Sequence, residues 1–76
     1  MRAEYHKGDL EWDAYMDLFE FHQSFGKPEL KNDNYWAEMI AAANELNNKY
    51  TGTRMSRVVN RHLITIMGLL DGEARA

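Results

Sequence analysis

Histidines are the side chains in this sequence best suited to acid–base chemistry or metal binding. His6 lies near the N-terminus, whereas His22 and His62 fall on the apolar faces of two segments with helical periodicity. If those helices packed together, the two imidazoles could meet and, with the carboxylate of Glu11, hold a metal ion or exchange protons. A histidine at the edge of an apolar face is far more often a partly buried side chain with one hydrogen bond, so a structural role is favoured.

No catalytic or cofactor motif accompanies these histidines. The sequence contains no cysteine, no glycine-rich phosphate loop, no nucleophile elbow and no zinc-ligand spacing. We therefore expect a protein that is not an enzyme and that uses no cofactor or metal.

Carboxylates form the first of two charged patterns. At about 100° per residue, four of them share an arc of about 80° on one segment: Asp9, Asp13, Asp17 and Glu20. This acidic stripe lacks the alternate-residue oxygen spacing of a calcium loop, and a rigid helix cannot converge such side chains on one ion. A solvated face is favoured. The alternatives are pairing with arginines, within the chain or in a second copy, and imitation of a phosphate backbone towards a basic partner.

Arginines form the second pattern, within TGTRMSRVVNRH, residues 51–62. Arg54, Arg57, Asn60 and Arg61 follow a short glycine-containing turn near the start of a helix, where a recognition helix contacts DNA. Three charges give little phosphate affinity, however, and the whole chain carries a net charge of −3. The favoured interpretation is a solvated basic edge whose guanidinium groups pair with nearby acids. Nucleic-acid binding and contact with an acidic protein are the alternatives.

Three segments of helical length must position these side chains. Turn-forming residues divide the chain into helices expected at about residues 10–25, 34–50 and 54–70. Each has an apolar face and strand-like alternation is absent, so the 76-residue chain is predicted to be one all-α domain, a small three-helix bundle.

Capping residues mark the ends of these helices. The expected N-caps are Asp9, then Asn32 or Asp33, then Thr53, and Gly26 is expected to end the first helix in a left-handed conformation. Residues 1–7 and the tail after Asp71 have little to bury and are expected to fray.

The first segment has more apolar surface than one neighbour can cover. Its apolar residues fill an arc of about 220°, whereas a surface helix commonly needs little more than about 100°. Either this helix is central and packs on both others, or part of it is an exposed protein-binding patch. The candidate interface consists of Trp12, Met16 and Phe19 beside Asp13, Asp17 and Glu20. Because the aromatic residues lie beside acids, without the interleaved Lys and Arg of single-strand binders, core or protein interface is favoured.

Nothing in the sequence indicates a membrane or an exported protein. The N-terminal stretch lacks the apolar core of a signal peptide, and no apolar run approaches the roughly 18 to 20 residues of a membrane span. We therefore expect a cytoplasmic protein without membrane contact.

A resemblance to a known group of proteins is carried by three runs of residues: LFEFHQSFG (18–26), NDNYWAEMIAAANELNNKY (32–50) and LITIMGLLDGEAR (63–75). Over about residues 12–75 the chain resembles a group of small uncharacterised helical proteins encoded by phages, prophages and mobile elements of Gram-positive bacteria. It departs from the group near its end, where MGLLDGEARA stands in place of a more continuous charged helix. The resemblance implies a setting in which small helical proteins often bind host or phage machinery.

Together these observations predict a non-enzymatic protein-interaction module with an unidentified protein partner or a second copy of itself. A nucleic-acid-binding protein that uses the basic edge is the alternative.

Overall fold

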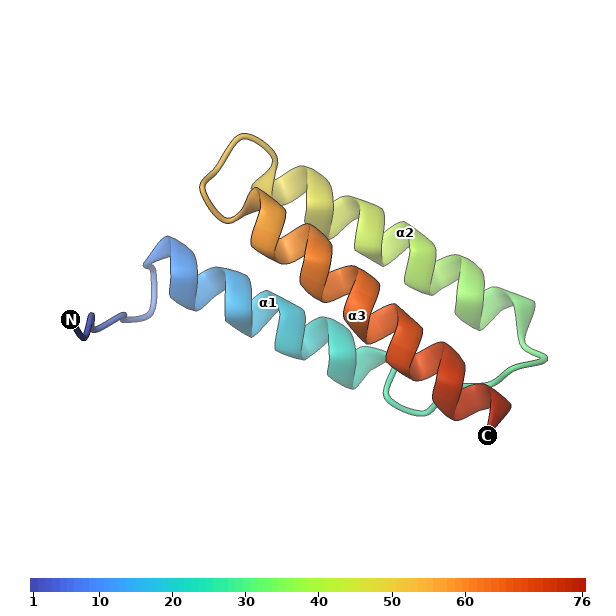
Figure 1. The fold of residues 1–76 in the computed structure, drawn as a ribbon. Helices are drawn as coiled ribbons and strands as arrows, with labels where there is room; N and C mark the ends of the chain where they lie inside the picture. Colours follow the sequence, from blue (N-terminus) through green and yellow to red (C-terminus); the bar gives the residue numbers. More distant parts are fainter.

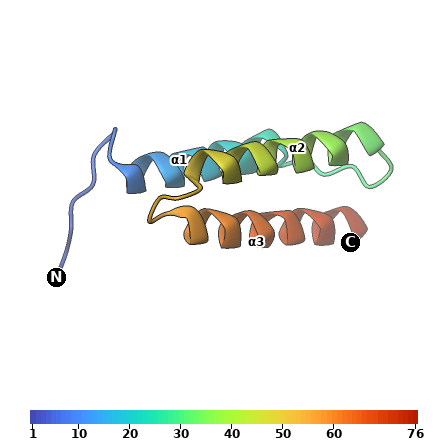
Figure 2. The same cartoon turned by 90° about the horizontal axis from the view of Figure 1, so that it is seen from above.

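The computed structural model describes all residues from Met1 to Ala76 and contains three helices and no strand. They are α1 (Leu10–Ser24), α2 (Asp33–Tyr50) and α3 (Ser56–Arg75). α1 and α3 run in the same direction and α2 runs against them (Figure 1). α1 and α2 lie side by side in one layer, and α3 forms the second layer, packed against both with its axis running nearly along theirs (Figure 2). The predicted all-α three-helix bundle is confirmed.

The core forms along one line of each helix. The buried residues recur at spacings of three, four or seven: Ala14, Leu18 and Phe21; Met39, Ala43 and Tyr50; Val59, Leu63 and Leu70, with Met55 just before α3. These spacings place apolar side chains on one face of each helix, and the three faces meet. No helix is long and apolar enough to cross a lipid bilayer.

Two of the expected N-caps lie where the sequence predicted them. Asn32 precedes α2, and its side-chain oxygen accepts a hydrogen bond from the backbone N–H of Tyr35 at 3.1 Å. Asp9 precedes α1, but its carboxylate accepts from the backbone N–H of His6 at 2.9 Å and makes no bond to the helix. The Asp9 side chain therefore stabilises the turn of residues 6–9 that precedes α1 and does not cap the helix.

The end of α1 differs from the prediction. The left-handed glycines of the chain are Gly8 and Gly52, so Gly26 does not end the helix in that conformation. α1 ends at Ser24, one residue earlier than expected. The hydroxyl of Tyr35 donates to the backbone carbonyl oxygen of Phe25 at 2.5 Å, so a side chain of α2 satisfies a carbonyl group at the end of α1.

The turn before α3 also differs. Thr53 is not the N-cap, and α3 begins at Ser56 instead of Arg54. The Thr53 hydroxyl donates to the carbonyl oxygen of Tyr50 at 2.7 Å and accepts from the backbone N–H of Met55 at 3.2 Å. Thr53 thus stabilises the turn itself, together with the left-handed Gly52.

The prediction that the third helix ends at residue 70 and that its tail frays is wrong, because α3 continues to Arg75. Leu70 is fully buried, so the turn that carries it is held against the other helices. Beyond it, the Arg75 guanidinium pairs with the Asp71 carboxylate at 3.0 Å, one turn apart. Residues 1–6 form no regular structure and are exposed, as expected of the N-terminal segment.

Candidate functional site: an exposed aromatic patch on α1

Four large apolar side chains on successive turns of α1 remain exposed. This aromatic patch consists of Trp12, Tyr15, Met16 and Phe19, whose side chains are 42% to 56% exposed. At about 100° per residue, its centre lies about 150° around the helix from the buried line of Ala14, Leu18 and Phe21. α1 thus packs against both other helices and still leaves an apolar surface uncovered. Sequence reasoning had omitted Tyr15, although it falls on the same apolar arc.

The N-terminal segment and α3 both border the patch. Tyr5 joins Trp12, Tyr15 and Met16 around a hollow of about 390 Å³. The Tyr15 ring also meets the His62 ring edge-on, with centroids 6.0 Å apart. No periodicity in the sequence could have placed Tyr5 here, because it precedes the first helix.

The disfavoured alternative, in which His22 and His62 meet beside Glu11, is not realised in the structure. His62 is exposed, and its Nδ1 lies 2.8 Å from the carbonyl oxygen of Val58, one turn earlier in its own helix. Glu11 is engaged by an arginine instead. No group of three or more His, Cys, Asp or Glu side chains is placed to hold a metal ion.

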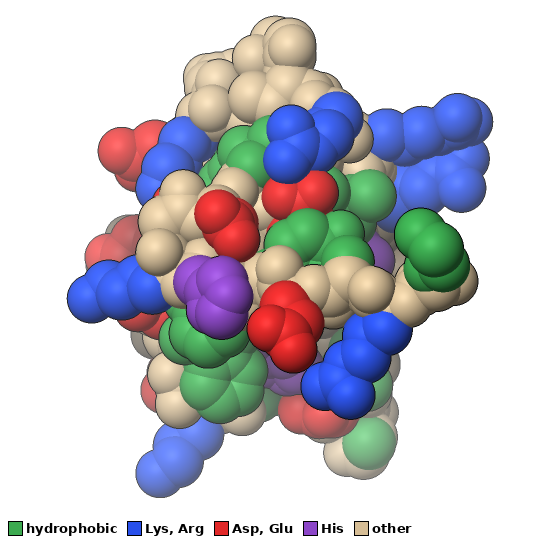
Figure 3. Space-filling model, turned by 90° about the vertical axis from the view of Figure 1, so that its left-hand side faces the viewer, with side chains coloured by type: hydrophobic (Ala, Val, Ile, Leu, Met, Phe, Trp, Pro, Cys, Tyr) green, Lys and Arg blue, Asp and Glu red, His purple; other side chains and the backbone are tan.

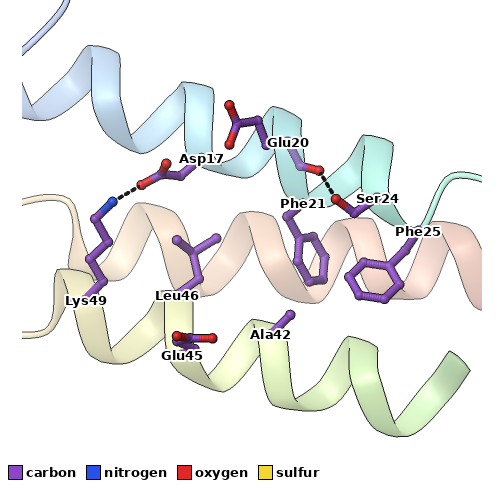
Figure 4. A pocket seen from close by; sticks show the side chains of 9 residues that line it. All are labelled: Asp17, Glu20, Phe21, Ser24, Phe25, Ala42, Glu45, Leu46 and Lys49. Carbon is purple, nitrogen blue, oxygen red and sulfur yellow. Dashed lines mark hydrogen bonds and ion pairs between the residues drawn. The ribbon is translucent and has the colours of Figure 1, made fainter. Parts of the chain in front are cut away.

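Asp17, in the acidic stripe, is held by two donors from α2. One oxygen of its carboxylate accepts from Lys49 Nζ at 2.7 Å (Figure 4) and from Tyr50 Oη at 2.6 Å. Partial burial tends to raise the pKa of Asp17, but the hydrogen bonds from Lys49 and Tyr50 outweigh it and lower this pKa below its ordinary value. Burial and the Asp17 carboxylate both raise the pKa of Tyr50.

The acidic stripe borders the aromatic patch. Asp13, Asp17 and Glu20 line a surface hollow together with Trp12 and Met16. Five of the six residues of the predicted protein interface therefore line one hollow, and the sixth, Phe19, is an exposed member of the aromatic patch. The basic partner of the stripe within the chain is Lys49 and not an arginine of α3.

Arg54 forms an ion pair between α1 and the α2–α3 turn. Its Nε and Nη2 donate to the two carboxylate oxygens of Glu11 at 3.0 and 2.8 Å. The hydrogen bond from Arg54 lowers the pKa of Glu11, and the same contact raises the pKa of Arg54. This pairing agrees with the interpretation of Arg54 as part of a solvated basic edge.

The remaining residues of the basic edge are free of ion pairs. Arg57 and Arg61 are exposed, and neither belongs to a salt bridge. Arg54, Arg57 and Asn60 border a polar hollow of about 530 Å³ beside the α2–α3 turn, whereas Arg61 lies outside it. Figure 3 looks onto the end of the molecule that carries the N-terminus and this turn. Basic side chains stand there at separate places around the edge, with acidic side chains between them.

Comparison of the chain with protein-family models, with curated proteins and with solved structures finds no significant match. The resemblance to phage and mobile-element proteins therefore stays a prediction.

Proposed function

We propose that this protein is a non-enzymatic interaction module that binds a protein partner through the aromatic patch of α1. The observation that carries the proposal is the exposure of four large apolar side chains on two turns of one helix, opposite the core. Contiguous apolar surface of this kind costs solubility and commonly marks a binding site on a small soluble protein. Its burial by a partner would remove that surface from water.

The composition of the surface fits a protein ligand. Trp, Tyr, Phe and Met are enriched at the centres of protein interfaces, and polar side chains surround them. Here Asp13, Asp17 and Glu20 supply such a rim on one side. Because Asp17 is fixed by Lys49 and Tyr50, part of the rim is ordered before binding, which reduces the entropy lost on association.

The proposal includes a biological setting. From the sequence resemblance we propose an origin in a phage, prophage or mobile element, and we also propose the cytoplasmic location that the sequence analysis expects. The partner is then a host or phage protein, and a homodimer through the same patch is the other form that the interaction can take.

A comparison of matched variants tests this function. Phe19→Ser with Met16→Gln, the patch variant, removes apolar contact from the aromatic patch. Ile64→Gln removes an exposed side chain from α3. Both are immobilised beside the wild type and exposed to lysate of the source cells. We expect the immobilised wild type and the Ile64→Gln variant to capture the same lysate protein, and the patch variant to fail to capture it. Equal retention by all three contradicts the proposal, and sedimentation of the wild type identifies self-association.

Nucleic-acid binding is the second candidate, favoured by one observation. The hollow beside the α2–α3 turn is lined by polar side chains without a carboxylate, and Arg57 is free there to meet a phosphate. An observation against nucleic-acid binding is that Arg54 is already paired with Glu11 and is therefore not free to contact a phosphate. Titration of labelled duplex and single-stranded DNA at low salt tests this alternative. If the wild type binds DNA and the double variant Arg57→Gln with Asn60→Ala binds it more weakly, this alternative is supported. The absence of binding at low salt rules it out.

A further inference from the structure

A second surface lies between α1 and α2. Figure 4 shows a groove there, of about 500 Å³, with α3 behind it. Its apolar lining comes from both sides: Phe21 of α1 and Phe25 just after it, and Ala42 and Leu46 of α2. Phe21 belongs to the buried core and the other three pack against it, so the lining is continuous with the core.

Carboxylates surround this groove. Asp17 and Glu20 border it from α1, and Glu45 borders it from α2. The one cation at the groove, Lys49, is committed to Asp17 at 2.7 Å. Glu20 and Glu45 belong to no salt bridge, so the groove presents uncompensated negative charge from both sides. A cationic ligand is attracted to it, and an anionic ligand is repelled.

We propose that the groove binds a basic amphipathic α-helix of a partner protein. Leucine-like or aromatic side chains of that helix would enter between Phe25 and Leu46, and lysines or arginines beside them would meet Glu20 and Glu45. The stems of such cationic side chains cover apolar surface while their charged ends reach a rim. This inference rests on the proposed function in one respect, that the natural ligand is a protein, but it uses different residues.

The dimensions of the groove suit a helix. Residues 17 to 24 of α1 border it, and these eight residues of α-helix extend about 12 Å. Helices that dock in grooves present anchors at positions i, i+4 and i+7, which span about 10 Å along the axis. An apolar stripe of two turns therefore fits the length of the lining.

The test uses two fluorescein-labelled peptides of leucine and lysine with identical composition. In one the leucines recur at helical spacing on one face, and in the other their order is scrambled. Fluorescence anisotropy measures the binding of each to four folded proteins. These are the wild type, a rim variant (Glu20→Gln with Glu45→Gln), a charge-matched control (Glu38→Gln with Glu73→Gln) and the patch variant. Circular dichroism verifies that each variant is folded.

We expect the amphipathic peptide to bind the wild type, the control and the patch variant alike, and to bind the rim variant about tenfold more weakly. Equal weakening in the rim variant and the control overturns the proposal, because net charge alone then explains the binding. Equal affinity for the scrambled peptide overturns it as well. So does weakening in the patch variant without weakening in the rim variant, which would place the peptide on the aromatic patch. Failure of the proposed function alone would leave this peptide binding intact.

Discussion

The Tyr50 hydroxyl donates a hydrogen bond of 2.6 Å to the Asp17 carboxylate and so joins the buried core to the acidic stripe. Tyr50 is only 3% exposed and ends α2, whereas Asp17 lies in the middle of α1. Asp17 borders both the hollow beside the aromatic patch and the groove between α1 and α2. A core side chain therefore fixes a residue shared by the edges of both proposed binding surfaces.

Tyr50→Phe is expected to destabilise the protein by about 1 to 2 kcal/mol, because it removes a hydrogen bond to a charged acceptor and keeps the ring in the core. Lys49 still pairs with Asp17 in this variant, so the carboxylate is not left without a partner. Urea denaturation measures the change. Tyr5→Phe is the control, since the Tyr5 ring is exposed. An equal loss in both variants would contradict a stabilising role for the Tyr50 hydroxyl.

Acid is expected to weaken the bundle through Asp17. Burial opposes ionisation, but the donors Lys49 and Tyr50 lower the folded-state pKa of Asp17 below its ordinary value of 3.8. The stabilisation from these donors is therefore complete above that ordinary value and is lost as the pH falls through the folded-state pKa. Glu11, whose pKa Arg54 lowers from 4.5, contributes with the same sign.

The variant Asp17→Asn isolates this effect. It should be less stable than the wild type at neutral pH, and the difference should shrink as the pH falls below about 4. Urea midpoints measured between neutral pH and pH 3 test it. Parallel profiles for the two proteins would show that Asp17 contributes no pH-dependent stability.

The fold could be predicted well because its signal is local. Capping residues and apolar periodicity placed all three helices, and Asn32 and Asp9 lie at the starts that the sequence indicated. The end of α3 was missed because the tail after Asp71 has little apolar surface to bury and was therefore expected to fray. The burial of Leu70, which keeps that turn helical, depends on packing between helices and not on local sequence.

Leu63→Ala should destabilise the bundle by about 2 to 5 kcal/mol, since Leu63 is almost fully buried and its truncation leaves a cavity. A loss of that size approaches the whole stability expected of so small a domain. The neighbouring Ile64 is 64% exposed, so Ile64→Ala should change stability by about 0.5 kcal/mol or less. Thermal denaturation compares the two, and similar losses would contradict the assigned core.

Gly68→Ala and Gly72→Ala should each stabilise the protein by about 0.5 to 1 kcal/mol. Both glycines lie inside α3, and an added Cβ meets no atom within 4 Å. Gly52 provides the contrast, because its φ of +83° disfavours any side chain and Gly52→Ala should destabilise. Chemical denaturation checks all three. Destabilisation by Gly72→Ala, with Gly68→Ala still stabilising, would argue that the helix ends near residue 70.

The candidate site could be predicted only in part. The apolar arc of α1 indicated Trp12, Met16 and Phe19, but it also fitted a helix buried on two sides. The pairings Glu11 with Arg54 and Asp17 with Lys49 join residues 43 and 32 positions apart. Such contacts depend on how neighbouring helices are aligned along their axes, which helical periodicity does not specify.

Site-specific photo-crosslinking in the source cells tests the aromatic patch most directly. A photoreactive phenylalanine analogue replaces Phe19 in one protein, and Ile40 or Ile64 in two matched controls, since all three side chains are exposed. We expect a discrete covalent adduct from position 19 that the controls do not give, and its mass distinguishes a second 8.9 kDa copy from another protein. The same adducts from all three positions, or none from position 19, would contradict the assignment of this face of α1 as the binding surface.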